Sequence, residues 1–292
     1  MERRTRILDR TTFLDLLDTH PIIAAPGAYD AFSARIIEQA DFPVVYFTGL
    51  GNEASDLGFP DIGLTTATEM ARRIGNVSQC VNVPVVCDGD TGFGGAINVT
   101  RTIRLFEAAG VAAIHLEDQT FPKRCGLLAG KQVISSQDFA RVIETALAAR
   151  RGDDFSIIAR SDAKATDGVD GVIARLQRYA DHGAHAAMLG DFYTLAEYER
   201  IAAALPIPLL ACAADRDHFD QQPDYSLDEW RNAGVRMVLY WHLPLFAALQ
   251  GVRDAVTSLK KRGSTSGLED RVAGYDDYAE VTDLEKWLEL EN

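Results

Sequence analysis

Short apolar runs rich in β-branched residues recur along the chain, and stretches with helical periodicity separate them. Most of the runs are continuously apolar rather than alternating, which is the pattern of parallel strands covered on both faces. The runs predict eight strands, over residues 22–25, 44–48, 83–88, 112–117, 156–160, 186–189, 208–212 and 237–240. The amphipathic stretches predict eight helices, over residues 31–40, 68–80, 98–109, 136–150, 168–182, 195–205, 226–233 and 243–262.

The alternation of strands and helices indicates the fold class. Eight strand–helix pairs in one α/β chain predict a closed (β/α)8 barrel of the TIM type. The alternative is a doubly wound open sheet, but no GxGxxG follows the first strand and no GxxxxGK[ST] occurs. Residues 1–21 predict an N-terminal helix, and the acidic but partly apolar residues 263–292 predict a helical tail that packs on a neighbouring subunit. We therefore expect a single domain over 1–292, with the barrel at about 21–262.

Composition narrows the classes of partner. The 292 residues carry 29 Lys and Arg against 43 Asp and Glu, a net charge of −14, which disfavours nucleic acid and anionic membranes as partners. No apolar run approaches the roughly 18 residues of a transmembrane helix, and no signal peptide is visible. Cys80, Cys87, Cys125 and Cys212 form no CxxC pair, so we expect neither a disulfide framework nor a zinc site. These features predict a cytoplasmic protein.

Acidic residues stand at the ends of two neighbouring strands, where a parallel barrel carries its reactive groups. Asp88 and Asp90 follow the third strand, and Glu117 ends the fourth. Like charges so close together are costly unless a cation lies between them, and oxygen ligands favour Mg²⁺ or Mn²⁺. The alternative is an Asx turn, or a helix N-cap before Asn98. Acids at two adjacent strand ends favour the metal site.

The loop after the fourth strand, residues 119–131, combines three cations, a thiol and two glycines. Charge concentrated between glycine hinges is typical of an active-site lid. Lys123 and Arg124 precede Cys125 directly, and neighbouring cations lower a thiol pKa, which makes Cys125 a candidate nucleophile or acid/base group. The alternative is a solvated basic loop in which the cysteine is incidental.

Three further strand ends carry candidate binding or catalytic residues. Arg160 ends the fifth strand, where a buried guanidinium needs either a carboxylate or phosphate ligand, or a barrel acid in a structural salt bridge. His242 follows the eighth strand and is equally a general acid/base or a packing histidine. Gly49 and Gly51 follow the second strand, and they predict either backbone N–H groups that approach an anion or a simple turn.

Taken together, these motifs resemble the isocitrate lyase/phosphoenolpyruvate mutase superfamily over residues 26–259. The resemblance rests on the segments Pro-Gly-Ala-Tyr-Asp at 26–30, Thr-Gly at 48–49, Leu-Gly-Phe-Pro-Asp at 57–61, Asp-Gly-Asp-Thr-Gly-Phe-Gly at 88–94, Leu-Glu-Asp-Gln at 116–119, Pro-Lys-Arg-Cys-Gly at 122–126 and Ala-Arg-Ser-Asp-Ala at 159–163. The cysteine in the lid makes the chain similar to the lyase branch, which includes methylisocitrate lyase, dimethylmalate lyase and oxaloacetate hydrolase. Phosphonopyruvate-type mutases lack this cysteine.

This resemblance implies a Mg²⁺-dependent carbon–carbon lyase, with Mn²⁺ as the other candidate ion, acting on a small 2-hydroxy or 2-oxo carboxylate such as a 2-alkylmalate or a methylisocitrate-like acid. It also implies a homotetramer with exchanged C-terminal helices. Asp88 would bind the metal directly, and Asp61, Asp90 and Glu117 would hold it through waters. The substrate carboxylate would be bound by Tyr46, Thr48, Gly49, Leu50 and Arg160. The catalytic candidates are Cys125, which would exchange a proton with the enolate-like carbon, together with Arg160, Lys123 and His242.

Three positions depart from the lyase pattern. Leu127 stands where a histidine is usual, Gly190 where a glutamate is expected, and Cys212 where an asparagine is expected. In the lyases those polar groups bind a second carboxylate or assist the lid cysteine, so we expect a substrate smaller or less charged than methylisocitrate. The segment 242–246 is similar to oxaloacetate decarboxylase-like members, in which a histidine contacts the substrate. The alternatives are therefore an oxaloacetate-type decarboxylase or hydrolase that uses His242, a phosphonopyruvate-type P–C bond enzyme, and a non-catalytic carboxylate-binding barrel.

Overall fold

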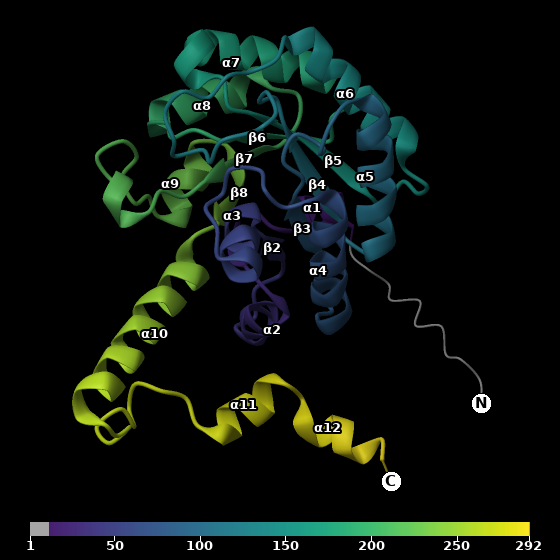
Figure 1. Cartoon of the computed structure of the whole chain (residues 1–292). Coiled ribbons are helices and arrows are strands. Elements are labelled where there is room, and N and C mark those ends of the chain that lie inside the picture. Colours follow the sequence, from purple (N-terminus) through teal and green to yellow (C-terminus); the bar gives the residue numbers. More distant parts are fainter. Residues whose placement is uncertain (1–11, 292) are drawn as a thin grey trace.

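The centre of the molecule is a closed barrel of eight parallel strands in sequence order (Figure 1). The structure is a computed structural model, and it describes residues 12–291. The strands are β1 (Ile23–Ala28), β2 (Val45–Phe47), β3 (Val85–Asp88), β4 (Ala113–Glu117), β5 (Ser156–Ser161), β6 (Ala186–Leu189), β7 (Leu209–Cys212) and β8 (Val235–Tyr240). Because β1 pairs with both β2 and β8, the sheet has no free edge. The predicted (β/α)8 barrel is confirmed, and the open-sheet alternative is excluded.

Helices cover the outside of this barrel (Figure 1). Those that follow the strands are α2 (Ala31–Gln39), α4 (Ala67–Cys80), α5 (Ala96–Ala109), α6 (Ser136–Ala149), α7 (Lys164–Asp181), α8 (Leu195–Ala204), α9 (Leu227–Asn232) and α10 (Leu243–Arg262). Several begin at side-chain caps; Thr66 and Thr194, for example, each form a capping box with the glutamate three residues on. The predicted helices agree with these bounds to within a few residues, because amphipathic periodicity and caps are both local signals.

The segment after β2 is helical, whereas the sequence pattern predicted either backbone N–H groups that approach an anion or a simple turn there. It forms α3 (Gly49–Asn52) and continues as the π-helical turn η1 (Glu53–Leu57). Glu53 is buried, and its carboxylate accepts the backbone N–H groups of Ile62 at 3.0 Å and Leu64 at 2.7 Å. A buried acid thus shapes the following loop, and no hydrophobic periodicity reports such a contact.

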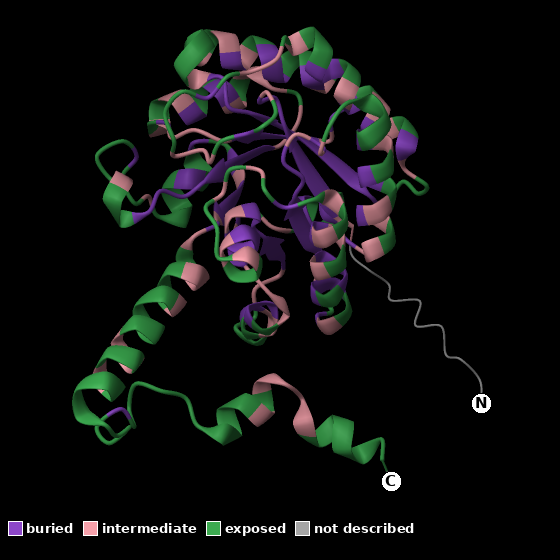
Figure 2. Ribbon diagram, viewed as in Figure 1, coloured by how far each residue is buried: buried purple, intermediate pink, exposed green. Residues whose placement is uncertain are grey.

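Two apolar clusters build the core, one inside the barrel and one between the barrel and its helices. Figure 2 shows the strands as the most buried part of the molecule. Helix α1 (Phe13–Thr19) contributes Phe13, Leu16 and Leu17 to the inner cluster. This helix lies within the predicted N-terminal helix, and the part of that prediction before residue 12 lies outside the described residues.

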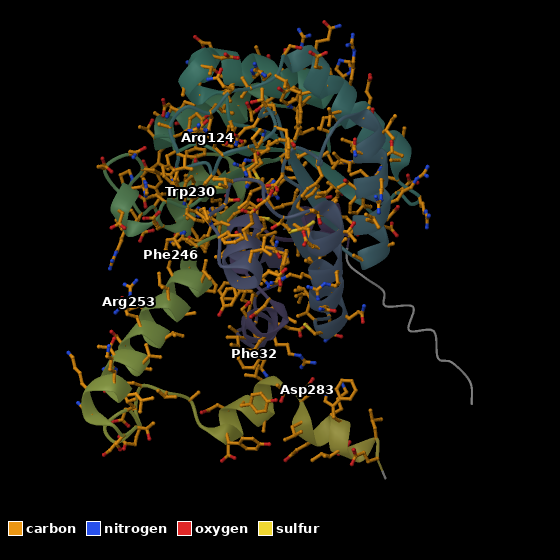
Figure 3. The ribbon with its side chains drawn as sticks, viewed as in Figure 1. Phe32, Arg124, Trp230, Phe246, Arg253 and Asp283 are labelled. Atoms are coloured by element: carbon orange, nitrogen blue, oxygen red, sulfur yellow. The ribbon has the colours of Figure 1, made fainter. Side chains whose placement is uncertain are left out.

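Helix α10 leaves the barrel and buries none of its residues (Figures 1 and 2). The tail then returns to α2 of the same chain through α11 (Tyr275–Val281) and α12 (Leu284–Glu289). Arg35 donates to Asp283 Oδ2 at 2.8 Å, and the ring of Phe32 stacks on Tyr278 (Figure 3). The tail is helical as predicted, and its exchange between subunits stays a prediction.

Among the helices of residues 12–291, none combines the length and the apolar character that crossing a bilayer requires.

Candidate functional site

A cavity opens where the strands end, as expected for this barrel type. Its lining residues come from all around the barrel: Tyr46, Thr48, Leu50, Asp61, Asp88, Cys125, Gly126, Leu127, Arg160, Met188, Gly190, Phe192, Cys212 and Trp241. The structure therefore brings the metal-site candidates Asp61 and Asp88, the lid thiol Cys125 and the substrate-binding candidates to one cavity.

Asp88 ends β3 with its carboxylate toward the cavity. Its Oδ1 accepts the backbone N–H of Asp90 at 3.0 Å, so the Asx turn considered from the sequence is present. The capping alternative is wrong, because Gly95 is the N-cap of α5. A Cβ on Gly49 would lie 2.6 Å from Asp88 Oδ2, so the glycine is what allows the loop after β2 to approach this carboxylate.

His115 lies beside Asp88 on the neighbouring strand β4 and contacts Tyr46. The Tyr46 hydroxyl lies 3.0 Å from His115 Nε2, and His115 Nδ1 lies 3.5 Å from Asp88 Oδ1. The imidazole is completely buried, and burial lowers its pKa to about 4, so the ring is neutral. The sequence did not predict His115 as a site residue, because a histidine inside an apolar strand looks the same as a core histidine.

Lys123 is buried at the cavity floor rather than beside the thiol. Its ammonium pairs with Asp61 and lies 2.8 Å from Asp90 Oδ1. Burial, reinforced by the negative charge of Asp61, raises the pKa of Cys125 to about 12, and Lys123 only partly opposes this shift. The predicted lowering of the thiol pKa is therefore wrong, because the flanking cations direct their charge elsewhere. Arg124 is exposed and donates to the Ala129 carbonyl at 3.1 Å (Figure 3).

Arg160 is held by acids on two sides. Its Nε donates to Asp162 Oδ2 at 2.8 Å and its Nη2 to Asp162 Oδ1 at 3.0 Å, while Nη1 lies 3.1 Å from Glu117 Oε2. The structural salt bridge that we considered is thus present. The same guanidinium also lines the cavity, so its outer edge faces any bound anion.

Four acids, which we call the acids of the cavity floor, outnumber the two cations beside them. They are Asp61, Asp88, Asp90 and Glu117, and the cations are Lys123 and Arg160. Burial raises the pKa of Asp90 to about 7 and that of Glu117 well above its usual range, so both carboxyl groups hold a proton more firmly than free acids. Glu117 Oε1 has no partner among the described residues.

This donor set fits a hard divalent cation. Carboxylate oxygens are the ligands that Mg²⁺ and Mn²⁺ prefer, and four acids converge here with two cations beside them. Over residues 12–291, no three acidic, histidine or cysteine side chains converge closely enough to hold an ion by themselves. An ion that keeps several of its waters, as Mg²⁺ does, suits such an arrangement.

His242 lies at the rim, outside the residues that line the cavity. It is the N-cap residue of α10, and its ring packs 4.8 Å from that of Trp241 and 5.6 Å from that of Phe246. Burial lowers its pKa, so the ring is neutral.

The three departures from the lyase pattern all line the cavity. Leu127, Gly190 and Cys212 lie there together with Met188 and Trp241. Apolar side chains thus make up much of the lining, and Arg160 is its one cationic residue among those that the structure describes.

Comparison with known proteins identifies the lineage. A family model described as phosphoenolpyruvate phosphomutase matches residues 13–260. The chain is 36% identical over 278 residues to 2,3-dimethylmalate lyase from Eubacterium barkeri, with 95% of each protein covered. The chain belongs to the isocitrate lyase/phosphoenolpyruvate mutase superfamily. The prediction of a carbon–carbon lyase of this superfamily is confirmed, because the named relatives are lyases of it.

Solved structures of this superfamily are similar over almost the whole chain. Oxaloacetate acetylhydrolase in complex with 3,3-difluorooxalacetate has a TM-score of 0.88 at 33% identity and covers 95% of this chain and 94% of its own. Phosphonopyruvate hydrolase in complex with oxalate and Mg²⁺ has a TM-score of 0.84 at 26% identity and covers 94% and 95%. A superfamily member therefore binds a divalent metal together with a small carboxylate.

Proposed function

We propose that this protein is a Mg²⁺-dependent carbon–carbon lyase that cleaves a 2-hydroxy acid of the 2-alkylmalate type. The observation that carries the proposal is the mixed lining of the cavity. Asp88, Thr48 and Arg160 line it together with the apolar side chains of Leu127 and Trp241. An acid with an alkyl branch matches both kinds of lining residue, whereas the three carboxylates of a tricarboxylate would have only Arg160 as a cationic lining residue.

The cleavage needs three contributions. Mg²⁺, when bound, supplies Lewis acidity that stabilises negative charge on substrate oxygens. The 2-hydroxyl group loses its proton to solvent, the bond between C2 and C3 breaks, and C2 becomes the carbonyl carbon of a 2-oxo acid. The electron pair of the broken bond passes to C3, the carbon that bears the second carboxylate. Arg160 stabilises the charge that develops on a carboxylate. Cys125, on the lid above the cavity, donates a proton to the carbon that is released.

The similarity to 2,3-dimethylmalate lyase supports this substrate class, because that relative is named for a malate with alkyl branches. Leu127, Gly190 and Cys212 support it as well, since they replace the polar groups expected for a second carboxylate.

A substrate panel followed by NMR tests the proposal. The panel holds 2,3-dimethylmalate, other 2-alkylmalates, 2-methylisocitrate, isocitrate, oxaloacetate and phosphonopyruvate, each with Mg²⁺ and then with EDTA. We expect a 2-oxo acid to appear from one alkylmalate only with Mg²⁺. Turnover that persists in EDTA would contradict the metal dependence, and turnover of phosphonopyruvate alone would make the protein a P–C bond enzyme.

A second candidate is hydrolysis or decarboxylation of an oxaloacetate-like acid. The similarity to oxaloacetate acetylhydrolase favours it. If this candidate is correct, the protein consumes oxaloacetate in the panel. If His242 takes part in that reaction, His242→Ala lowers kcat/KM for oxaloacetate. Binding of oxalate without turnover of any acid would leave a non-catalytic carboxylate-binding barrel.

A further inference from the structure

Lys131, at the far end of the lid loop, is a buried cation that the proposed reaction does not use. Only 6% of the residue is exposed. Its ammonium lies 3.1 Å from Asp162 Oδ1 and also pairs with Asp191. A lysine buried at this depth is costly unless it is paired, and here two carboxylates outweigh the burial and raise its pKa. The lysine is therefore charged.

The ion pairs of Lys131 lead directly to Arg160. Asp162 Oδ1 accepts from Lys131 Nζ at 3.1 Å and from Arg160 Nη2 at 3.0 Å, so one oxygen joins both cations. Asp162 is completely buried, and its other contacts hold it in place: its backbone N–H donates to Asp118 Oδ1 at 2.9 Å. The orientation of Arg160 thus depends on a carboxylate that Lys131 also holds.

Lysines anchor both ends of the lid loop, which we call its first leg, around Lys123, and its second leg, around Lys131. Lys123 on the first leg pairs with the acids of the cavity floor, and Lys131 on the second leg pairs with acids after β5 and β6. Between the legs, Gly126 lies so close to Gly190 that a Cβ on Gly126 would be 2.7 Å from the Gly190 carbonyl oxygen. The middle of the lid loop therefore packs against the loop after β6.

Charge balance gives the lysine a second role. Arg160 and Lys131 together face three acids, Glu117, Asp162 and Asp191. Without Lys131, Asp162 would keep Arg160 alone and Asp191 would lose the ammonium that it pairs with, so the added negative charge would oppose an anionic substrate at Arg160.

We propose that Lys131 is a positioning residue that fastens the second leg of the lid and keeps Arg160 available to the substrate carboxylate. The binding of substrate by Arg160 rests on the proposed function, whereas the fastening of the lid by Lys131 does not. Lid closure and capture of the anion are then coupled through one oxygen of Asp162.

The test compares Lys131→Met, Lys131→Arg and the matched control Lys164→Met. Lys164 is the control because, among the described residues, its ammonium pairs with Glu197 on α8 and donates to the Phe192 carbonyl, and it contacts neither Asp162 nor Arg160. Amide hydrogen exchange of residues 120–130 reports the lid, and calorimetric titration of oxalate with Mg²⁺ reports anion binding. In Lys131→Met we expect lid exchange to accelerate and the Kd of oxalate to rise, each about tenfold. Lys131→Arg should restore both, and Lys164→Met should change neither.

Asp191→Asn separates the fastening of the lid from the binding of the anion. It also replaces Lys131→Met as the test if that variant does not fold. It removes one of the partners of Lys131 without adding negative charge near Arg160, so lid exchange should rise while the Kd of oxalate does not. Lid exchange and oxalate affinity within twofold of wild type in Lys131→Met would overturn the inference. If Lys131→Met is unfolded, unchanged lid exchange in Asp191→Asn would overturn it. Neither readout needs turnover, so an enzyme that binds oxalate but cleaves no alkylmalate would refute the proposed function alone.

Discussion

Lys123 acts as a counter-ion for the acids of the cavity floor. Its long apolar stem lets the ammonium reach Asp61 and Asp90 although the residue is near Cys125 in sequence. The charge therefore stabilises carboxylates, and the thiol keeps a raised pKa. Neighbours in sequence are poor guides to charge partners when the side chain is this long.

The proton transfer by Cys125 predicts the behaviour of Cys125→Ser. A serine hydroxyl fits the same space but is a far weaker acid, so we expect kcat for the alkylmalate to fall about 100-fold or more. NMR of product formation at saturating substrate measures it. The matched control is Cys80→Ser, because Cys80 lies on α4 outside the cavity and its thiol contacts the Ala31 carbonyl. Equal rates in wild type and Cys125→Ser would refute the role.

Gly190 leaves room for the Arg160–Asp162 pair. A Cβ there would lie 2.4 Å from Asp162 Oδ1 and 2.6 Å from Arg160 Nε. Gly190→Ala must displace that pair, so we expect a loss of about 1–3 kcal/mol in the free energy of unfolding, together with a raised KM. Urea denaturation and initial rates measure the two effects.

Gly251→Ala is the control, because open space surrounds Gly251 on α10. It should not weaken substrate binding, and alanine at a helix-interior position should stabilise the protein slightly. A Gly190→Ala variant with unchanged stability and KM would show that the pair tolerates the methyl group.

At the scale of elements, α7 anchors the end of β5 through a buried polar cluster. Asp118, after β4, accepts from Ser161 Oγ at 2.9 Å and from the Tyr179 hydroxyl at 2.8 Å, and Arg175 Nη1 lies 3.3 Å from it. Tyr179 and Arg175 both come from α7. The strand end that carries Arg160 is therefore held by a helix on the outside of the barrel.

This cluster predicts the effect of Asp118→Ala. Several buried donors would lose their acceptor, and we expect the free energy of unfolding to fall by about 3 kcal/mol. Urea denaturation measures the change. Asp170→Ala is the control, since Asp170 on α7 forms an exposed pair with Arg200 that contributes little. Equal losses in both variants would contradict a special role for the cluster.

At the scale of the whole molecule, α10 is a long helix with an uncovered apolar face (Figure 2). The exposed apolar residues are Leu243, Phe246, Leu249, Val252, Val256 and Leu259. A contiguous patch of exposed apolar side chains marks an interface in most proteins. We propose that α10 packs on a second copy of the chain, in the homotetramer with exchanged helices that the family resemblance implies.

Val252→Asp tests this assembly. A carboxylate within a buried apolar interface is costly, so we expect the variant to shift from the tetramer to smaller species. Sedimentation velocity measures the distribution. Lys261→Glu, which changes the charge of an exposed residue on the same helix, should leave the assembly unchanged. A wild-type protein that sediments as a monomer would contradict the proposal.

The sequence by itself determined the barrel and the edge of the barrel that carries the chemistry. Continuous apolar strands and amphipathic helices are recognised from residues that are close together in the sequence. Tertiary packing therefore does not change where these elements occur. The same holds for Asp88 and Arg160, because a residue at the end of a parallel strand lies on the active rim in any barrel of this type.

Only the tertiary structure decided which charges meet and which residues are buried. It pairs Lys131 with Asp162 and Asp191, directs Lys123 away from the thiol, and links His115 to Tyr46. These contacts join residues from different strands and loops. Burial strengthens electrostatic interactions and shifts pKa values, and burial is a property of the packed molecule rather than of a segment. For that reason residue types located the site, and packing set its electrostatics.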